Sequence, residues 1–254
     1  MKAVAVIQAR NKSSRLPGKV LMTIGDKPML AHVINRVRLA HSIDEVIVAT
    51  TDESADDIIA DLCQEMGTAV FRGKQYDVLD RVYQAVQPYQ PDVVVRLTAD
   101  CPLLDPQLID DVVHLLVDNK LDFAANRLPP PWKRSFPIGL DVEVCTFAGL
   151  QRAWREASKK YEREHVMPYF YDEEGRFNIA VLQTEPDYGH LRWTVDTQVD
   201  LDLIREIYSR IVDKDRYSWK DILEIVEQNP ALNEINADIK AKLTQDVDER
   251  SVEK

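Results

Sequence analysis

The feature that most restricts the fold of this chain is a regular alternation of short apolar runs and amphipathic helical patterns. Residues 3–9 form an almost unbroken apolar run, which is typical of a strand buried on both faces. Residues 28–40 follow with apolar side chains at helical spacing. The same pair of patterns recurs at 45–50 with 54–66, at 69–71 with 77–86, and at 92–97 with 106–117. Such alternation predicts an α/β fold with a mostly parallel sheet and helices on both faces.

The alternation breaks after residue 125. Three consecutive prolines within 126–137 forbid a helix interior and favour extended backbone. We expect a small inserted subdomain over about 126–190. Its predicted elements are a strand at 140–145, helices at 147–157 and near 164–171, and a strand at 177–183.

A strand at 191–195 is then expected to return the chain to the main sheet, followed by helices at 199–212 and 218–227. One main domain would therefore span residues 1–236. The remaining tail, 237–254, is rich in charge and poor in large apolar side chains, so we expect it to fray.

Charge and hydropathy exclude several classes of protein. A net charge of -11 over 254 residues repels phosphate backbones, so nucleic acid is not expected as a partner. No apolar stretch approaches the roughly 18 residues that a membrane span requires, and the first apolar run is too short for a signal peptide. Three cysteines, an odd number, suit free thiols in a reducing compartment. We therefore expect a cytoplasmic protein without a membrane partner.

The loop after the first predicted strand is cationic. Residues 10–27 carry five basic side chains and one acidic side chain. Ligands of open parallel sheets bind beyond the carboxyl ends of the strands, where Arg10, Ser13, Arg15 and Lys19 would offer donors to a triphosphate. An ordinary solvated basic loop is the alternative interpretation. The loop matches neither a Walker A motif nor a G-x-G-x-x-G fingerprint, which argues against P-loop ATPases and dinucleotide dehydrogenases.

The segment 10–19, RNKSSRLPGK, directly follows an Ile-Gln-Ala strand end and resembles the signature of the sugar-acid cytidylyltransferases. That group makes CMP-ketodeoxyoctonate and CMP-sialic acid. The similarity is greatest to its spore-coat polysaccharide F (SpsF-like) branch and extends to about Asn236. The resemblance implies a Rossmann-like, three-layer nucleotide-diphospho-sugar transferase fold. It also implies that the CTP phosphates are bound by Arg10, Arg15 and Lys19, with Ala9 and Ser13 beside the nucleotide.

Two aspartates follow predicted strand ends far apart in the sequence, Asp100 after 92–97 and Asp196 after 191–195. Carboxylates suit Mg2+, which offsets the charge that builds on the phosphates during nucleotidyl transfer. Helix capping is the competing interpretation, and it is the better one for Asp105 and Asp200. In the family that the chain resembles, matching strand-end aspartates bind the metal, so we expect Asp100 and Asp196 to hold Mg2+.

Further candidates flank these two groups. The resemblance assigns Arg72 and Asp80 to the stretch that lines the nucleoside pocket. Thr98 has a hydroxyl that could meet a base edge or the ribose, although threonine is also a common strand residue. On the acceptor side we name five polar residues, for several of which an exposed surface position is the alternative. They are Asp141, Glu143, Arg163, His165 and His190.

The sequence therefore predicts a Mg2+-dependent transfer of CMP from CTP to a sugar-acid acceptor, with release of pyrophosphate. One rival is a glycosyltransferase that consumes a nucleotide sugar, but such enzymes usually carry an Asp-x-Asp pair where this chain has Thr-Ala-Asp-Cys-Pro. The other rival is a noncatalytic nucleotide-binding module. The resemblance also implies a homodimer, with residues 129–132 and Phe136 as candidate contacts.

Overall fold

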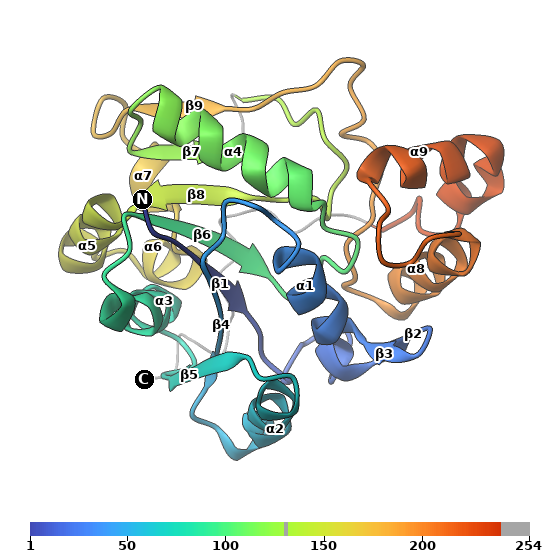
Figure 1. Cartoon of the computed structure of the whole chain (residues 1–254), viewed down its shortest axis with the longest axis horizontal. Helices are drawn as coiled ribbons and strands as arrows, with labels where there is room; N and C mark the ends of the chain where they lie inside the picture. Colours follow the sequence, from blue (N-terminus) through green and yellow to red (C-terminus); the bar gives the residue numbers. More distant parts are fainter. Residues whose placement is uncertain (130–131, 240–254) are drawn as a thin grey trace.

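The computed structural model describes residues 1–129 and 132–239. At its centre lies a seven-stranded sheet in the order β5-β4-β1-β6-β8-β7-β9 (Figure 1). The strands are β1 (Ala3–Gln8), β4 (Glu45–Thr51), β5 (Ala69–Gly73), β6 (Val93–Thr98), β7 (Phe123–Ala125), β8 (Glu143–Thr146) and β9 (Ile179–Val181). Only β8 runs antiparallel to its neighbours within this sheet. The predicted α/β fold with a mostly parallel sheet is confirmed.

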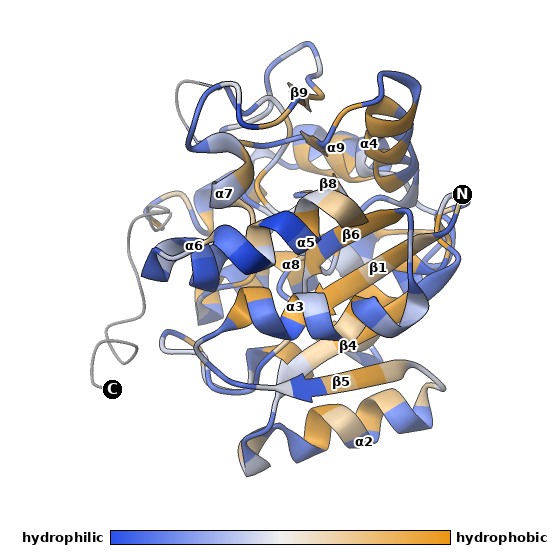
Figure 2. Cartoon of the chain, turned by 90° about the vertical axis from the view of Figure 1, so that its left-hand side faces the viewer, coloured by the Kyte–Doolittle hydropathy of each residue, from blue (hydrophilic) through white to orange (hydrophobic). Residues whose placement is uncertain are grey.

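Strand β1 shows why an unbroken apolar run forms a central strand. Successive side chains point to opposite faces, and here Ala3, Ala5 and Ile7 join one hydrophobic cluster while Val4 and Val6 join the other. Both faces are covered by helices, so neither accepts a polar residue. Figure 2 shows the apolar β1 and β6 behind helices whose outer surfaces are hydrophilic.

The helices divide between the two faces according to the cluster into which their buried side chains pack. One face carries α1 (Met29–Val37), α2 (Asp57–Glu65) and α4 (Pro106–Asp118). The other carries α3 (Val78–Val86), α5 (Phe147–Glu156) and α7 (Pro168–Tyr171), and α6 (Lys160–His165) packs against α3 and α7. Figure 1 shows α8 (Gln198–Arg210) and α9 (Trp219–Gln228) beyond the carboxyl ends of β1 and β6. The short elements are η1 (Lys19–Leu21), β2 (Thr23–Ile24), β3 (Lys27–Pro28), η2 (Ser54–Asp56), η3 (Gln87–Tyr89) and η4 (Pro230–Glu234).

The prediction of a strand at 191–195 is wrong. This segment forms one isolated parallel bridge, between Ile138 and Arg192. Its alternating apolar side chains are buried, which produced the strand-like pattern, but its backbone partners lie in loops: Val195 N donates to the carbonyl of Asp100 at 2.9 Å. The segment also passes close to residue 139, which must be glycine. Gly139 has a φ of +108°, and a Cβ atom there would lie 2.5 Å from Thr194 N.

The segment 126–190 also differs from expectation. We expected its strands to form a separate small subdomain, but β8 and β9 belong to the main sheet. The single helix expected near 164–171 is two helices, α6 and α7. Val166 between them has a φ of +72°, and Pro168 begins the second helix, where its missing N–H costs nothing.

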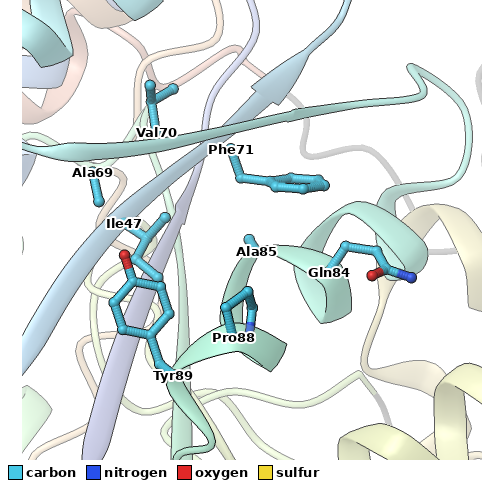
Figure 3. Close-up of a pocket in the computed structure, with 8 residues that line it drawn as sticks. All are labelled: Ile47, Ala69, Val70, Phe71, Gln84, Ala85, Pro88 and Tyr89. Atoms are coloured by element: carbon cyan, nitrogen blue, oxygen red, sulfur yellow. The ribbon is translucent and has the colours of Figure 1, made fainter.

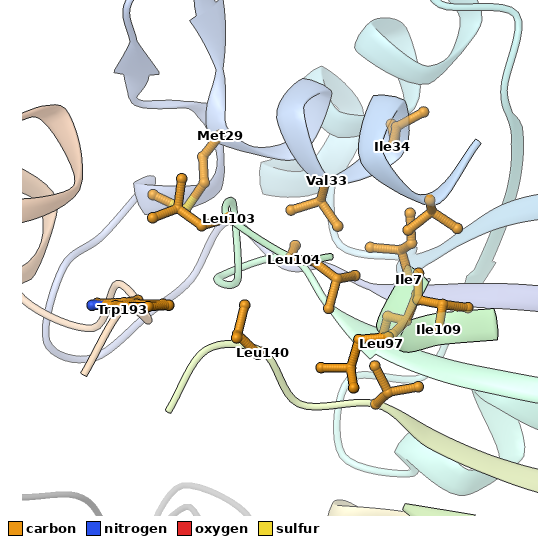
Figure 4. Packing of buried hydrophobic residues seen from close by; sticks show 14 of the residues in the cluster. Ile7, Met29, Val33, Ile34, Leu97, Leu103, Leu104, Ile109, Leu140 and Trp193 are labelled. Carbon is orange, nitrogen blue, oxygen red and sulfur yellow. The ribbon is translucent and has the colours of Figure 1, made fainter. Parts of the chain in front are cut away.

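Apolar side chains near the carboxyl edge of the sheet pack into one cluster (Figure 4). It includes Leu103 and Leu104, which follow Asp100, and Trp193, which precedes Asp196. Phe136 is also buried, against Trp219, so it is not an exposed dimer contact as we had expected. Among residues 1–129 and 132–239, no helix has the length and apolar composition needed to cross a membrane. Most of the tail 237–254 lies outside the described residues.

Candidate active site

The cationic loop after β1 is folded by a polar residue that the sequence analysis did not single out. The carbonyl of Asn11 accepts hydrogen bonds from the N–H groups of Ser13 and Gly18, at 3.0 and 2.8 Å. Asn11 is in turn held by Asp56, which accepts its N–H at 2.7 Å. Gly18 has a φ of 75°, which glycine adopts without strain, and this turn delivers Lys19 into the interior.

Lys19 joins the two predicted metal ligands. Its buried ammonium group donates to Asp100 Oδ2 at 2.8 Å and to Asp196 Oδ1 at 3.0 Å. A third hydrogen bond goes to the carbonyl of Val195 at 2.7 Å. The two aspartates are 96 positions apart in the sequence, and the structure brings them together with the cationic loop at one point on the carboxyl edge of the sheet.

Asp196 lies among three cations. Besides Lys19, Arg15 contacts its Oδ1 at 2.7 Å and Arg192 contacts its Oδ2 at 2.7 Å. Arg192 also binds Asp200 Oδ1 at 2.9 Å. The backbone N–H of Asp196 donates to Asp200 Oδ2 at 3.0 Å. Asp196 is therefore fixed both through its side chain and through its main chain.

Asp200 anchors this part of the site from the first turn of α8. It is fully buried, and it forms a capping box with Thr197. Asn236 donates to its Oδ1 at 2.8 Å. The predicted capping role of Asp200 is confirmed, as is that of Asp105, which accepts the N–H groups of Gln107 and Leu108 at the start of α4.

The charges of the site hold one another ionised. Burial alone lowers the pKa of Lys19, but the adjacent Asp100 and Asp196 outweigh it and leave that pKa above its ordinary value. Burial raises the pKa of each carboxyl group, and Lys19 overcomes this effect, so both aspartate pKa values lie below their usual range. At neutral pH the cluster therefore consists of an ammonium ion between two carboxylates.

The donor set suits a magnesium ion that takes its other ligands from substrate. Mg2+ is commonly held by one or two carboxylates together with phosphate oxygens and water. Within the part of the chain that the structure describes, no group of three or more His, Cys, Asp or Glu side chains could hold a metal. Asp100 and Asp196 form a pair of hard oxygen donors, and the ammonium of Lys19 already bridges them as a cation. The residues present therefore fit Mg2+ bound jointly by protein and nucleotide.

Two of the residues predicted on the nucleoside side lie on β5 and α3. Arg72 is on β5, where it donates to the carbonyls of Thr51 and Glu53 and pairs with Asp57. Asp80 is on α3 and accepts a hydrogen bond from the indole of Trp154 at 2.8 Å. These contacts tie neighbouring elements together, so both side chains have structural partners.

Three further predicted residues lie close to the loop and the aspartates. Ala9 immediately follows β1 and is buried. Arg10 follows Ala9, and its charge acts on the buried Arg81 of α3. Thr98 ends β6, and its hydroxyl lies 3.3 Å from Cys101 Sγ.

On the opposite side of β6, Asp141 and Glu143 each have an arginine partner. Arg134 donates to both carboxylate oxygens of Asp141, at 2.5 and 3.0 Å. Glu143 is paired with Arg96, which also donates to Gln8 at the end of β1 at 2.7 Å. Because β8 is antiparallel, its amino end meets the carboxyl ends of β1 and β6, and these two acids line the same edge as Asp100.

Arg163 has its partners on α3 and α5. The guanidinium of Arg163 binds both oxygens of Asp77, at 3.0 and 2.7 Å, and the carbonyl of Trp154. These contacts join α6 to α3 and α5 rather than to Asp141. His165 ends α6, and His190 is exposed in the turn before the 191–195 segment.

A cavity of about 270 Å³ lies away from this edge, between β5 and α3 (Figure 3). Its walls include Ile47 and Ala69, which stand near the amino ends of β4 and β5, together with Tyr89. The carboxyl ends of the same strands carry the residues described above. The cavity is therefore distinct from the site.

A parallel sheet that gathers a cationic loop and an acidic pair at one edge is suited to hold a nucleotide by its phosphates, as the class of nucleotidyltransferases requires. The family model described as cytidylyltransferase matches residues 4–239, and the chain belongs to that family. The resemblance noted in the sequence is thus confirmed.

Relatives extend over nearly the whole chain. An uncharacterised protein of Methanocaldococcus jannaschii, MJ1063, is 37% identical over 252 residues, 98% of this chain and 100% of that protein. The spore coat polysaccharide biosynthesis protein SpsF of Bacillus subtilis is 31% identical over 241 residues, 92% of this chain and 98% of SpsF. The structure of a cytidylyltransferase from Leptospira borgpetersenii, 31% identical, superimposes with a TM-score of 0.86 over 96% of this chain and 100% of that one.

Proposed function

We propose that this cytidylyltransferase transfers CMP from CTP to a sugar-acid acceptor in a Mg2+-dependent reaction that serves surface polysaccharide biosynthesis. The observation that carries the proposal is the meeting of Lys19 with Asp100 and Asp196 beside the cationic loop. SpsF, a relative over almost the full length, is named for polysaccharide biosynthesis, which supports this setting. The three cysteines are buried free thiols, which supports a reducing compartment such as the cytoplasm.

In the proposed reaction an acceptor oxygen attacks the α-phosphorus of CTP, and the bond from that phosphorus to the departing pyrophosphate breaks. Arg10, Arg15 and Lys19 would bind the triphosphate oxygens and face the charge that develops on the leaving group. Asp100 and Asp196 would hold Mg2+, which supplies further neutralisation of phosphate charge when bound. Positioning and charge complementarity carry the rate enhancement, so the reaction needs no covalent enzyme intermediate.

Pyrophosphate release tests the proposal directly. The full chain is incubated with CTP, Mg2+ and a panel of sugar acids, and UTP and ATP serve as nucleotide controls. We expect pyrophosphate only when CTP and an acceptor are both present. Nucleotide binding without pyrophosphate from any acceptor would instead indicate a noncatalytic module. In a parallel incubation supplied with a nucleotide sugar in place of CTP, consumption of that nucleotide sugar without pyrophosphate would indicate a glycosyltransferase.

The family resemblance also leads us to propose a homodimer. Sedimentation equilibrium should then return twice the chain mass of 29.1 kDa. A single species at 29.1 kDa across the micromolar range would contradict it.

A further inference from the structure

Three arginines and two acids cluster between the ends of β6 and β7. The acids, Asp141 and Glu143, are each paired with one arginine, Arg134 and Arg96 respectively. The third arginine, Arg127, has no such partner: within residues 1–129 and 132–239 its side chain forms no hydrogen bond or ion pair. The cluster therefore has one positive charge in excess.

The main chain at Arg127 is held firmly. Arg127 lies two residues beyond β7, and the preceding residue, Asn126, is buried. The amide of Asn126 donates to the carbonyl of Leu140 at 2.7 Å and accepts the N–H of Val142 at 2.9 Å. These bonds fix the start of β8 against the end of β7. Arg127 consequently projects from a rigid position rather than from a free loop.

The position of Arg127 connects the cluster with the paired aspartates. The Arg127 charge contributes to lowering the pKa of Asp141 and acts on Tyr171, so its guanidinium lies within electrostatic reach of both. The Asp141 charge acts in turn on Cys101, which adjoins Asp100. Only β8 separates β6 from β7, so their ends are about 10 Å apart at the usual strand spacing. An arginine side chain covers most of that distance.

We propose that Arg127 binds a carboxylate of the acceptor and thereby sets the acceptor hydroxyl toward the nucleotide site; this inference rests on the proposed function. A guanidinium group offers two parallel N–H donors that match the two oxygens of a carboxylate. Arg96 and Arg134 are already engaged by the protein's own acids, whereas Arg127 is available and partly exposed. The acceptor is then an organic acid, and a neutral sugar is disfavoured.

The test uses the full chain, CTP and Mg2+ with 3-deoxy-manno-octulosonate and N-acetylneuraminate, each also as its neutral methyl ester. The variants are Arg127→Ala, Arg127→Lys and a matched control, Arg155→Ala, which removes one positive charge from an exposed position on α5. We expect Arg127→Ala to raise the KM of the preferred acid about 10- to 100-fold, the range for hydrogen bonds to charged groups. The KM of CTP should stay within about twofold, since the phosphates bind elsewhere.

Two comparisons make the result specific. The methyl ester should be a poor acceptor for the wild type and should lose nothing further in Arg127→Ala, whereas Arg127→Lys should recover part of the acid's KM. An equal loss for acid and ester, or a parallel rise in the KM of CTP, would overturn the assignment. Turnover of neutral acceptors alone would overturn it together with the sugar-acid part of the proposed function, and would leave the transfer of CMP from CTP standing. Absence of pyrophosphate with every acceptor would overturn both.

Discussion

Lys19 sets the charge balance of the site. Its ammonium lies against two carboxylates in a largely buried position, and the loss of one member of such a group leaves uncompensated charge away from water. Asp196 has Arg15 and Arg192 as further partners, whereas Asp100 forms its ion pair with Lys19. The stability of the wild-type cluster should therefore be most sensitive to changes at Lys19.

The pKa shifts define the pH range over which the cluster stabilises the fold. The carboxylate pKa values are depressed in the folded state, so their contribution is present above about pH 4, the ordinary aspartate value, and is lost as pH falls through the folded pKa. The pKa of Lys19 is raised, so its contribution is present below about pH 10 and is lost as pH rises through the folded pKa.

Lys19→Met should lower the free energy of unfolding at pH 7 by about 3 kcal/mol, because it leaves buried carboxylates without their ammonium partner. Burial then raises the pKa of Asp100, so acidification protonates it and relieves the loss. The deficit relative to wild type should shrink between pH 7 and pH 4.5 in urea titrations. A deficit independent of pH would contradict this account. Lys220→Met, at an exposed lysine, is the control.

Asp100→Asn should reduce the rate of pyrophosphate release by about 10²- to 10³-fold, because a neutral amide replaces a charged oxygen donor beside the reacting phosphates. Circular dichroism should show the wild-type fold. Asp111→Asn, on the exposed face of α4, should retain full activity. Normal turnover of Asp100→Asn would remove Asp100 from the metal assignment.

The first turn of α8 connects helix formation to the geometry of the site. Asp200 caps α8, binds Arg192 and accepts the N–H of Asp196. Asp221 has the same capping-box role at the start of α9, but it is exposed and, within residues 1–129 and 132–239, it binds no arginine. The two positions therefore separate the effect of capping from that of the buried ion pair.

Asp200→Ala should destabilise the protein by about 3 kcal/mol or more, because Arg192 loses its buried partner. Asp221→Ala should lower the free energy of unfolding by about 1 kcal/mol, the usual size of a helix-capping interaction. Chemical denaturation of both variants at pH 7 measures the difference. Equal losses would show that the Arg192 pair adds nothing to stability.

Local patterns predicted most of the elements but not all of the site. Periodicity identified strands β1, β4, β5 and β6 and the helices α1 to α4, and the end of β6 indicated Asp100 as a candidate. The prediction of a strand at 191–195 was wrong because Leu191, Trp193 and Val195 are buried in the alternating pattern of a strand. The backbone of this segment pairs with loops instead. Neighbouring residues in the sequence do not reveal such partners.

The residues that the sequence analysis missed are those whose roles depend on distant contacts. Asn11 and Asp56 fold the cationic loop together across 45 positions, and Arg192 was treated only as part of a strand. No local spacing distinguishes these side chains from ordinary polar residues. The pairs of Arg96 with Glu143 and Arg134 with Asp141 likewise depend on β8, which was expected as a strand of the subdomain and not as an antiparallel neighbour of β6.

The whole molecule is acidic while its cationic loop is basic, so association with CTP through this loop, as proposed, should depend on ionic strength. Raising the salt concentration from about 0.02 to about 0.5 M shortens the Debye length to a few ångströms, and we expect the KM of CTP to rise about tenfold. In Arg15→Ala the initial KM should be higher and the dependence on salt weaker. Identical salt curves for the two proteins would contradict a phosphate-binding role for Arg15.

The single reversed strand also affects how the family could diversify. Since β8 runs against its neighbours, residues 132–142 reach the carboxyl edge of β1 and β6 from the opposite direction, so in the proposed reaction they would line the acceptor side while β1, β4 and β6 form the frame of the nucleotide side. Insertions or exchanges in that stretch would alter acceptor choice without disturbing CTP. Transplanting it between relatives is accordingly a direct way to engineer new sugar-nucleotide products.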